Sequence, residues 1–179
     1  SLTSIVIPNS VEFISSQVFD GCNGLKLVVL YNSVKTIWRA AINCPDATVF
    51  CEPESRPNGW YSDWCINADT VIWGKKVVVD ENFIYEIDNA SKSLTVMIYK
   101  YIGSGTTIVI PEKVTIDGTE YLIDNKKKNA FRDCSDLVSV SIPNSILSIG
   151  SGAFYGCDNT TIYCAVASQP EGWSNDWKS

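Results

Sequence analysis

Histidine is absent from the 179 residues of this chain. Its absence excludes the Ser-His-Asp and Cys-His arrangements that activate a nucleophile in many hydrolases. The sequence has no Gly-x-x-x-x-Gly-Lys-Ser/Thr loop for a nucleotide phosphate. Because Cys-x-x-Cys pairs are missing as well, no zinc site is predicted. The residue types therefore predict neither an enzyme nor a bound cofactor or metal.

Positive charge and long apolar segments are also scarce. The chain has 14 Lys and Arg against 20 Asp and Glu, a net charge of −6, which argues against nucleic acid as a partner. No apolar run reaches the roughly 18 residues that a membrane-spanning helix needs. The hydrophobic content of 45% is ordinary for a globular chain, and the length predicts one or two small domains.

One segment occurs near both ends of the chain. Residues 2–23 read LTSIVIPNSVEFISSQVFDGCN and residues 137–158 read LVSVSIPNSILSIGSGAFYGCD, identical at half of their positions without a gap. A weaker copy begins at Leu25. The period lies in the low twenties, with leucine-like residues at the first, fourth and sixth positions. This pattern indicates a leucine-rich repeat solenoid.

Each unit is expected to begin with a short strand. In the second strong copy, Val140 and Ile142 share one face of the strand, while Ser139 and Ser141 share the other. No unit can bury its own apolar side chains, so neighbouring units must stack. The predicted fold is an α/β leucine-rich repeat solenoid with short parallel strands, short helical or 3-10 turns on the opposite side, and β-hairpin caps.

The repeat resembles the BspA-like family of leucine-rich repeats, which is found largely in bacterial cell-surface proteins. Residues 141–157, SIPNSILSIGSGAFYGC, closely match the family pattern L-x-x-I-x-I-P-x-S-V-x-x-I-G-x-x-A-F-x-x-C, and residues 7–22 match it well. The resemblance implies an extracellular or cell-surface location. It also implies adhesion to host matrix or to other cells.

A second repeated segment follows each run of units. Residues 48–64 read TVFCEPESRPNGWYSDW and residues 161–177 read TIYCAVASQPEGWSNDW. The last coil of a solenoid must be covered, and tryptophan offers a large apolar area with an indole N–H that seeks an acceptor. We therefore predict structural caps whose aspartates bond backbone amides or indoles; the alternative is a sugar-stacking platform. The cap residues are Trp60, Asp63, Trp64, Trp73, Trp173, Asp176 and Trp177.

The two caps divide the chain into two arrays. Residues 1–74 are expected to be the C-terminal part of a first array with its Trp-rich cap. Residues 75–179 are expected to form a second, short array. Its predicted parts are an N-terminal hairpin cap (75–123), repeats (124–160) and a Trp-rich C-terminal cap (161–179).

Two hairpins are predicted within the N-terminal cap of the second array. Residues 83–87 and 94–101 are β-rich runs joined by polar residues. Residues 114–123 are expected to form the second hairpin, turning at Asp117-Gly118.

The chain has 7 cysteines, an odd number. Four of them fall at one repeat position and are interpreted as buried thiols stacked in a ladder: Cys22, Cys44, Cys134 and Cys157. The spacing of about 5 Å between neighbouring strands also lies within reach of a disulfide. A reduced ladder is favoured, and a Cys22–Cys44 disulfide stays open as the alternative.

The predicted function is a non-catalytic module of a bacterial surface protein that binds a macromolecule through a solenoid face. The family resemblance implies a host-matrix or cell-surface protein as the partner. The candidate contact residues lie on strands and face away from the coil interior, where an exposed apolar strip would mark a contact site. They are Thr3, Ser4, Val6, Lys26, Leu27, Val29, Val138, Ser139 and Ser141. The alternative for the apolar ones in the first array is packing under a neighbouring segment.

Two other functions are weighed against this one. A carbohydrate-binding module would use the cap aromatics with Tyr99 and Tyr101, and a passive spacer would bind nothing. The first strand also has no cap before it. An open apolar edge is therefore expected near Leu2, Ile5 and Ile7, and such an edge favours self-association.

Overall fold

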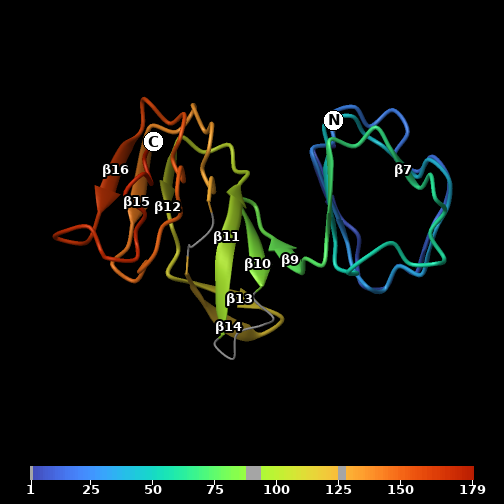
Figure 1. The fold of residues 1–179 in the computed structure, drawn as a ribbon, viewed down its shortest axis with the longest axis horizontal. Helices are drawn as coiled ribbons and strands as arrows, with labels where there is room; N and C mark the ends of the chain where they lie inside the picture. The colour runs from blue at the N-terminus through green and yellow to red at the C-terminus, as the bar shows by residue number, and fades with distance from the viewer. Residues whose placement is uncertain (1, 88–93, 125–127) are drawn as a thin grey trace. The chain divides into compact units, whose positions relative to one another are not determined.

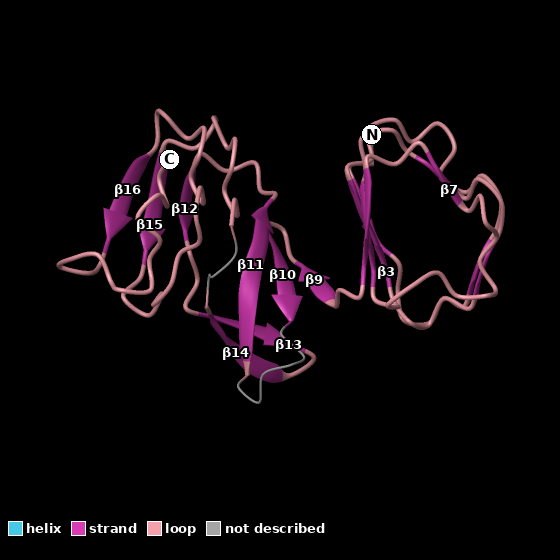
Figure 2. Ribbon diagram, in the orientation of Figure 1, coloured by secondary structure: helices cyan, strands magenta, loops and turns pink. Residues whose placement is uncertain are grey.

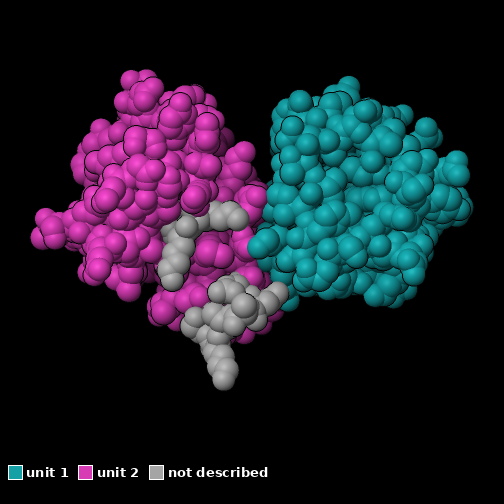
Figure 3. All heavy atoms as spheres, in the orientation of Figure 1, with its two compact units in different colours: residues 1–77 teal, residues 78–179 magenta. Residues whose placement is uncertain are grey.

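The computed structural model describes residues 2–87, 94–124 and 128–179. The chain divides into two compact units, unit 1 (Ser1–Val77) and unit 2 (Val78–Ser179), coloured separately in Figure 3. Each unit encloses an apolar core of its own. The division falls close to the array boundary expected after Gly74.

Unit 1 is a solenoid of short strands. Its strands are β1 (Ser4–Val6), β2 (Phe13–Ile14), β3 (Leu27–Leu30), β4 (Thr36–Ile37), β5 (Ile42–Asn43), β6 (Thr48–Cys51), β7 (Cys65–Ile66) and β8 (Thr70–Trp73).

The strands of unit 1 stack in parallel, one from each coil. The main sheet has the order β1-β3-β6-β8, and its register aligns Ile5, Val28, Val49 and Val71. Val28 and Val49 are fully buried in the core of the unit. The short ladders β2–β4 and β5–β7 close the other side of the coils. Stacking of units that cannot bury their apolar residues alone is thus the basis of this core.

Unit 2 combines hairpins with a second solenoid sheet. The strands from the boundary onward are β9 (Val77–Val79), β10 (Phe83–Ile87), β11 (Thr95–Tyr101), β12 (Thr107–Val109), β13 (Lys113–Ile116), β14 (Thr119–Ile123), β15 (Ser139–Ile142) and β16 (Thr161–Cys164).

Both predicted hairpins are present. β10 and β11 pair in antiparallel fashion, and the residues that join them, 88–93, lie outside the described part of the chain. β13 and β14 are also antiparallel and turn at Asp117 (φ 49°) and Gly118 (φ 78°). Two successive residues with positive φ are the requirement of the tight hairpin turn that Asp-Gly favours. These four strands and β9 form one sheet, in the order β13-β14-β11-β10-β9.

A three-stranded parallel sheet, in the order β12-β15-β16, forms the solenoid part of unit 2; Figure 1 shows its strands side by side. β12 lies inside residues 75–123, which the sequence analysis assigned to a hairpin cap. It is a coil strand because Ile108 and Ile110 are buried on one side and Pro111 follows. That pattern repeats Val140, Ile142 and the proline after them. The cap strand β16 is likewise a full member of this sheet.

The expected helical or 3-10 turns are not found: the described residues contain no helix (Figure 2). Between strands the coils bend through turns with left-handed residues, among them Gly152 (φ 59°) and Gly156 (φ 75°). Left-handed residues interrupt a right-handed helix. The segment between them is also far shorter than the roughly 12–15 residues at which an isolated helix becomes stable. The helical part of the fold prediction is therefore wrong, and the solenoid of parallel strands is confirmed by the strand pairing.

Candidate interaction surface

One face of the β12-β15-β16 sheet points away from the core of unit 2. Strand alternation sends Ile108 and Val140 inward, where both are buried. On each of the three strands, the residues before and after the inward-pointing one face outward. These outward residues align in two rows across the sheet. We call this surface the outer face of unit 2. It consists of Thr107, Ser139 and Thr161 in one row, and of Val109, Ser141 and Tyr163 in the other.

The first row is a line of hydroxyl groups. Ser139 Oγ donates a hydrogen bond to Thr107 Oγ1 at 3.2 Å. Thr107 and Thr161 are exposed, and Ser139 is half-buried. Each hydroxyl can both donate and accept. The row therefore offers hydrogen-bonding groups without carrying a charge.

The second row places two large side chains on either side of a small one. Val109 is 67% exposed and Tyr163 is 59% exposed, while Ser141 between them is half-buried. Strand spacing puts the Val109 and Tyr163 backbones roughly 10 Å apart, with Ser141 between them. Val138, 59% exposed, directly precedes β15. Single exposed apolar residues are ordinary, but a group of them marks a contact surface.

None of the predicted contact residues of unit 2 is fully buried. Val138 is exposed, and Ser139 and Ser141 lie half-buried on the outer face. Val109 and Tyr163 were not among the predicted contact residues, because their strands were assigned to caps. The signal was present: Ile108-Val109-Ile110-Pro111 has the same spacing as Val140-Ser141-Ile142-Pro143.

The predicted contact residues of unit 1 divide into two groups. Thr3, Ser4 and Lys26 are exposed, and Lys26 Nζ lies 2.6 Å from Asp46 Oδ2 in an exposed ion pair. Val6 is half-buried.

Two of the candidate contact residues of unit 1, Leu27 and Val29, are not exposed. Leu27 and Val29 are only 4% and 1% exposed. Residues 27–30 read Leu-Val-Val-Leu and are all buried. A continuous apolar run is typical of a parallel strand that is covered on both faces. The alternative of packing beneath other residues therefore holds for these two positions.

The open apolar edge expected at the first strand is smaller than predicted. Strand β1 does lie at the edge of its sheet. Leu2 is 46% exposed and Ile5 is half-buried, but Ile7 is buried in the core of unit 1. Ile7 N–H donates to Val29 O at 3.0 Å, which holds this residue inside the coil.

The tryptophans of the two repeated segments adopt the same arrangement. Trp60 Nε1 donates to Val34 O at 3.1 Å, and Trp173 Nε1 donates to Ile146 O at 3.0 Å. The ring centroids of Trp60 and Trp64 are 4.8 Å apart, and those of Trp173 and Trp177 are 5.1 Å apart. All four side chains are buried in the core of their unit. Trp73 is half-buried, and its ring centroid lies 5.8 Å from that of Trp60.

Burial removes the support for a sugar platform on these rings, since stacking needs an open ring face. Tyr101, also named for that role, is buried, and its hydroxyl donates to Gly105 O at 2.9 Å. Tyr99 is half-buried.

The cap aspartates have partners other than indoles, which donate to backbone carbonyls and to Gln169 instead. The Asp176 carboxylate accepts hydrogen bonds from the hydroxyls of Ser151, at 2.6 Å, and Ser174. These bonds hold the pKa of Asp176 below its usual range. Asp63 Oδ1 lies 4.0 Å from Arg39 Nε.

The cysteines are free thiols in the structure. Cys44 and Cys157 are buried as predicted, but Cys22 and Cys134 are only half-buried. Burial, with a smaller contribution from Cys157, raises the pKa of Cys134 to about 11. Burial also raises the pKa of Cys65 to about 11. Neutral thiols are weak nucleophiles and poor metal ligands.

The described ranges contain neither a metal-binding cluster nor a membrane-spanning helix. Across residues 2–87, 94–124 and 128–179, no three His, Cys, Asp or Glu side chains are grouped as they would be around a metal ion. The same ranges hold no helix with the length and apolar character that crossing a membrane requires.

The family model described as "BspA type Leucine rich repeat region (6 copies)" matches residues 1–50 and 92–168. A search of curated proteins finds no match.

Three bacterial structures are similar to the chain. A leucine-rich repeat protein from Bacteroides capillosus ATCC 29799 is 21% identical over 56% of this chain and 91% of its own, with a TM-score of 0.48. A T. pallidum leucine-rich repeat protein is 30% identical over 55% of this chain and 41% of its own, with a TM-score of 0.41. A leucine-rich cell surface protein from Faecalibacterium prausnitzii A2-165 is 15% identical over 98% of this chain and 69% of its own, with a TM-score of 0.43.

Proposed function

This chain belongs to the BspA-type leucine-rich repeat family, and we propose that it is a non-catalytic module that binds a protein partner through the outer face of unit 2. Leucine-rich repeat domains generally serve protein interaction. An adhesive role, a cell-surface location and a partner from host matrix or another cell surface are parts of the same proposal. The family supports each of them.

The observation that carries the proposal is the exposed row of Val109, Ser141 and Tyr163 beside the hydroxyl row. Val109 and Tyr163 add nothing to the core, because they point away from it. Burying apolar surface releases roughly 25 cal/mol per Å². Tyrosine is also among the residues that dominate protein interfaces. A partner that covers this face would bury the apolar side chain of Val109 and the ring of Tyr163, and it could form hydrogen bonds with the neighbouring hydroxyl row.

The chemistry of the chain supports a binding role over a catalytic one. With histidine absent, the serine and cysteine side chains of the chain lack the base that most often activates them. Burial keeps the pKa of Cys134 and Cys65 near 11, so these thiols stay protonated at neutral pH.

The test is binding to a panel of purified extracellular-matrix proteins by the wild-type chain and two matched variants. Tyr163→Ser removes the aromatic ring from the outer face of unit 2. Tyr155→Ser removes a tyrosine that is 49% exposed but belongs to none of the three strands of that face. We expect Tyr163→Ser to weaken binding at least tenfold, or about 1.4 kcal/mol, while Tyr155→Ser binds like the wild type.

Thermal unfolding of both variants checks that the fold is intact. Equal binding by all three proteins would move the contact site away from the outer face of unit 2. Failure of the wild type to bind any member of the panel would favour the passive spacer.

A further inference from the structure

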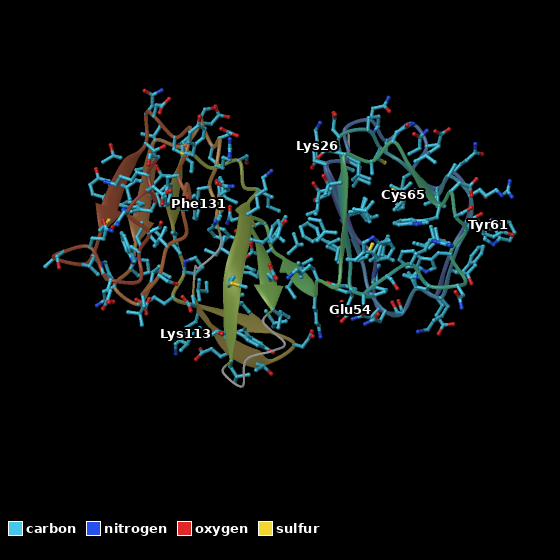
Figure 4. The ribbon with its side chains drawn as sticks, in the orientation of Figure 1. Lys26, Glu54, Tyr61, Cys65, Lys113 and Phe131 are labelled. Atoms are coloured by element: carbon cyan, nitrogen blue, oxygen red, sulfur yellow. The ribbon has the colours of Figure 1, made fainter. Side chains whose placement is uncertain are left out.

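Unit 1 carries a row of exposed aromatic side chains on successive coils. Phe13, Trp38 and Tyr61 are 50%, 45% and 45% exposed. The buried residues beside them, Ile14, Ile37 and Trp60, are aligned by the β2–β4 register and by the parallel bridge between Ile37 and Trp60. We call the exposed set Phe13, Trp38 and Tyr61 the aromatic row. Figure 4 shows Tyr61 projecting from the outside of unit 1.

Arg39 and a small cavity complete this site. The rings of Phe13 and Trp38 are perpendicular, with centroids 5.3 Å apart. The Arg39 guanidinium carbon lies 5.5 Å from the centroid of the Tyr61 ring. Ser16, Trp38, Arg39 and Tyr61 line a cavity of 110 Å³. The site thus combines aromatic walls, one cation and a recess.

Unit 2 shows that the coil itself does not require these aromatic residues. Its bridge between Ile149 and Trp173 is equivalent to the bridge between Ile37 and Trp60. In unit 2, Gly150 follows Ile149 at the position that Trp38 has in unit 1. Ser174 follows Trp173 at the position that Tyr61 has in unit 1. The two tryptophan indoles make nearly identical hydrogen bonds, 3.1 Å and 3.0 Å. The same scaffold therefore forms with small residues at these positions.

The composition of the site fits a protein partner. Tryptophan, tyrosine and arginine are the residue types most enriched at the energetic centres of protein interfaces. The Arg39 side chain is 72% exposed, and its carboxylate neighbour Asp63 is 4.0 Å away. A guanidinium so exposed can take a carboxylate from a partner in a bidentate pair.

The size and shape of the site favour a side chain over a sugar. The recess has a volume of 110 Å³ and is open to solvent, so it accommodates one small apolar side chain. The interplanar angle of 88° between Phe13 and Trp38 also rules out a flat stacking platform across these rings. Arg39 already lies over the Tyr61 ring.

We propose that the aromatic row and Arg39 bind a polypeptide segment that inserts a proline or a small aliphatic side chain between Trp38 and Tyr61 and places a carboxylate on Arg39. Proline suits the recess because extended proline-containing segments dock between aromatic side chains with little loss of conformational entropy. This site is distinct from the outer face of unit 2, and the proposal stands independently of it.

The experiment begins with a phage-displayed library of random linear peptides, selected against the full chain. We expect the enriched peptides to share an acidic residue next to proline, valine or alanine. One enriched peptide, synthesised with a fluorescent label, then reports affinity by anisotropy. Trp38→Ala, Tyr61→Ser and Arg39→Gln should each weaken it at least tenfold, and replacing the peptide's acidic residue by its amide should have the same effect.

Two controls make the result specific. Tyr163→Ser, on the outer face of unit 2, should leave the peptide affinity unchanged, and circular dichroism should show all variants folded. Rising salt should weaken the wild type more than Arg39→Gln, because salt screens the charge pair. Selection without a shared motif overturns the proposal. So does equal binding by Trp38→Ala and Tyr61→Ser, or binding to a glycan panel that depends on Trp38 when no peptide is enriched.

Discussion

Phe131 and Phe154 stack face to face, with ring centroids 4.6 Å apart and planes inclined by 4°. They occupy the same position in successive coils, and both are buried. The contact continues on one side to Phe83 of the hairpin, at 6.2 Å, and on the other to Trp177, at 5.7 Å. Aromatic packing between coils therefore runs through unit 2 from the hairpin strands to the C-terminal tryptophans.

This stacked pair should show an interaction energy of its own. Phe131→Leu and Phe154→Leu should each lower the free energy of unfolding by about 1–3 kcal/mol, the ordinary range for a core substitution. The double variant should lose less than the sum, by the ~0.5–1.5 kcal/mol that aromatic pairs contribute beyond area burial. Urea denaturation followed by circular dichroism measures all three. Additivity within about 0.3 kcal/mol would mean that the rings act independently.

A left-handed turn position offers a matched pair of substitutions. Ala40 has φ 48° and donates to Asp63 O at 2.8 Å, and Gly152 has φ 59° and donates to Asp176 O at 2.9 Å. Left-handed backbone costs a residue with a Cβ about 1–2 kcal/mol. Ala40→Gly should therefore raise the free energy of unfolding by about 1 kcal/mol, after the entropic cost of glycine.

Gly152→Ala should do the reverse and lower the free energy of unfolding by at least ~1 kcal/mol. A Cβ at this position would also lie 2.8 Å from Asn129 Oδ1. Thermal and urea unfolding of the two variants would check the pair, and changes of the same sign in both would contradict the assignment.

The buried tryptophans should contribute through their hydrogen bonds as well as their area. Trp173→Phe removes the donor to Ile146 O and leaves this carbonyl unpaired next to a smaller ring. An unsatisfied buried acceptor costs about 1–3 kcal/mol. Trp60→Phe should have a similar effect through Val34 O. The exposed Trp38 is the control, and Trp38→Phe should change the midpoint of urea unfolding little.

Two half-buried serines have a buried hydroxyl oxygen with no hydrogen-bond partner among the described residues: Ser33 and Ser145. Both follow the asparagine of the turn after a coil strand. An unpaired buried hydroxyl costs about 1–3 kcal/mol. Ser145→Ala should therefore raise the free energy of unfolding by about 1 kcal/mol. A loss of stability in urea denaturation would reveal a hydrogen bond at this hydroxyl.

Stability should fall in mildly alkaline solution because of Cys134. Its pKa is about 11 in the folded chain, against about 8.5 in an unfolded one. As the pH rises above about 8.5, the unfolded chain loses this proton first. The free energy of unfolding is thus at its full value below that pH and decreases toward pH 11. Urea unfolding of Cys134→Ala between pH 8 and 10 should show a flatter profile than the wild type, and parallel profiles would contradict the assignment.

Individual residues show which features of the fold can be predicted from the local sequence pattern. Val140 and Ile142 were recognisable as core residues because the repeat places them in register, and stacking buries them. Asp117-Gly118 identified its hairpin because few other dipeptides tolerate two positive φ values. The strand at Thr107–Val109 was missed, although Ile108, Ile110 and Pro111 carried the repeat signal, because the hairpins on either side of it dominated the interpretation.

The turns and the surfaces were harder to predict. Gly152 and Gly156 stand in a segment whose Ala-Phe pair suggested a helical turn, yet their left-handed backbone bends the coil without one. Leu27 and Val29 face away from the coil interior but are buried. Phe13, Trp38 and Tyr61 stand in three coils without a shared local motif, and only the folded structure brings the Phe13 ring against Trp38 and places Trp38 and Tyr61 beside one recess.

The amino-acid sequence by itself determined the repeat, the parallel stacking of its strands, the two hairpins and the absence of histidine-based chemistry. Each of these depends on residue type and on spacing along the chain, which are properties of the sequence alone. Which outward side chains stay exposed was decided only by the tertiary structure. Exposure depends on what covers a side chain, and the covering residues are brought there by the folded chain and not by spacing along the sequence.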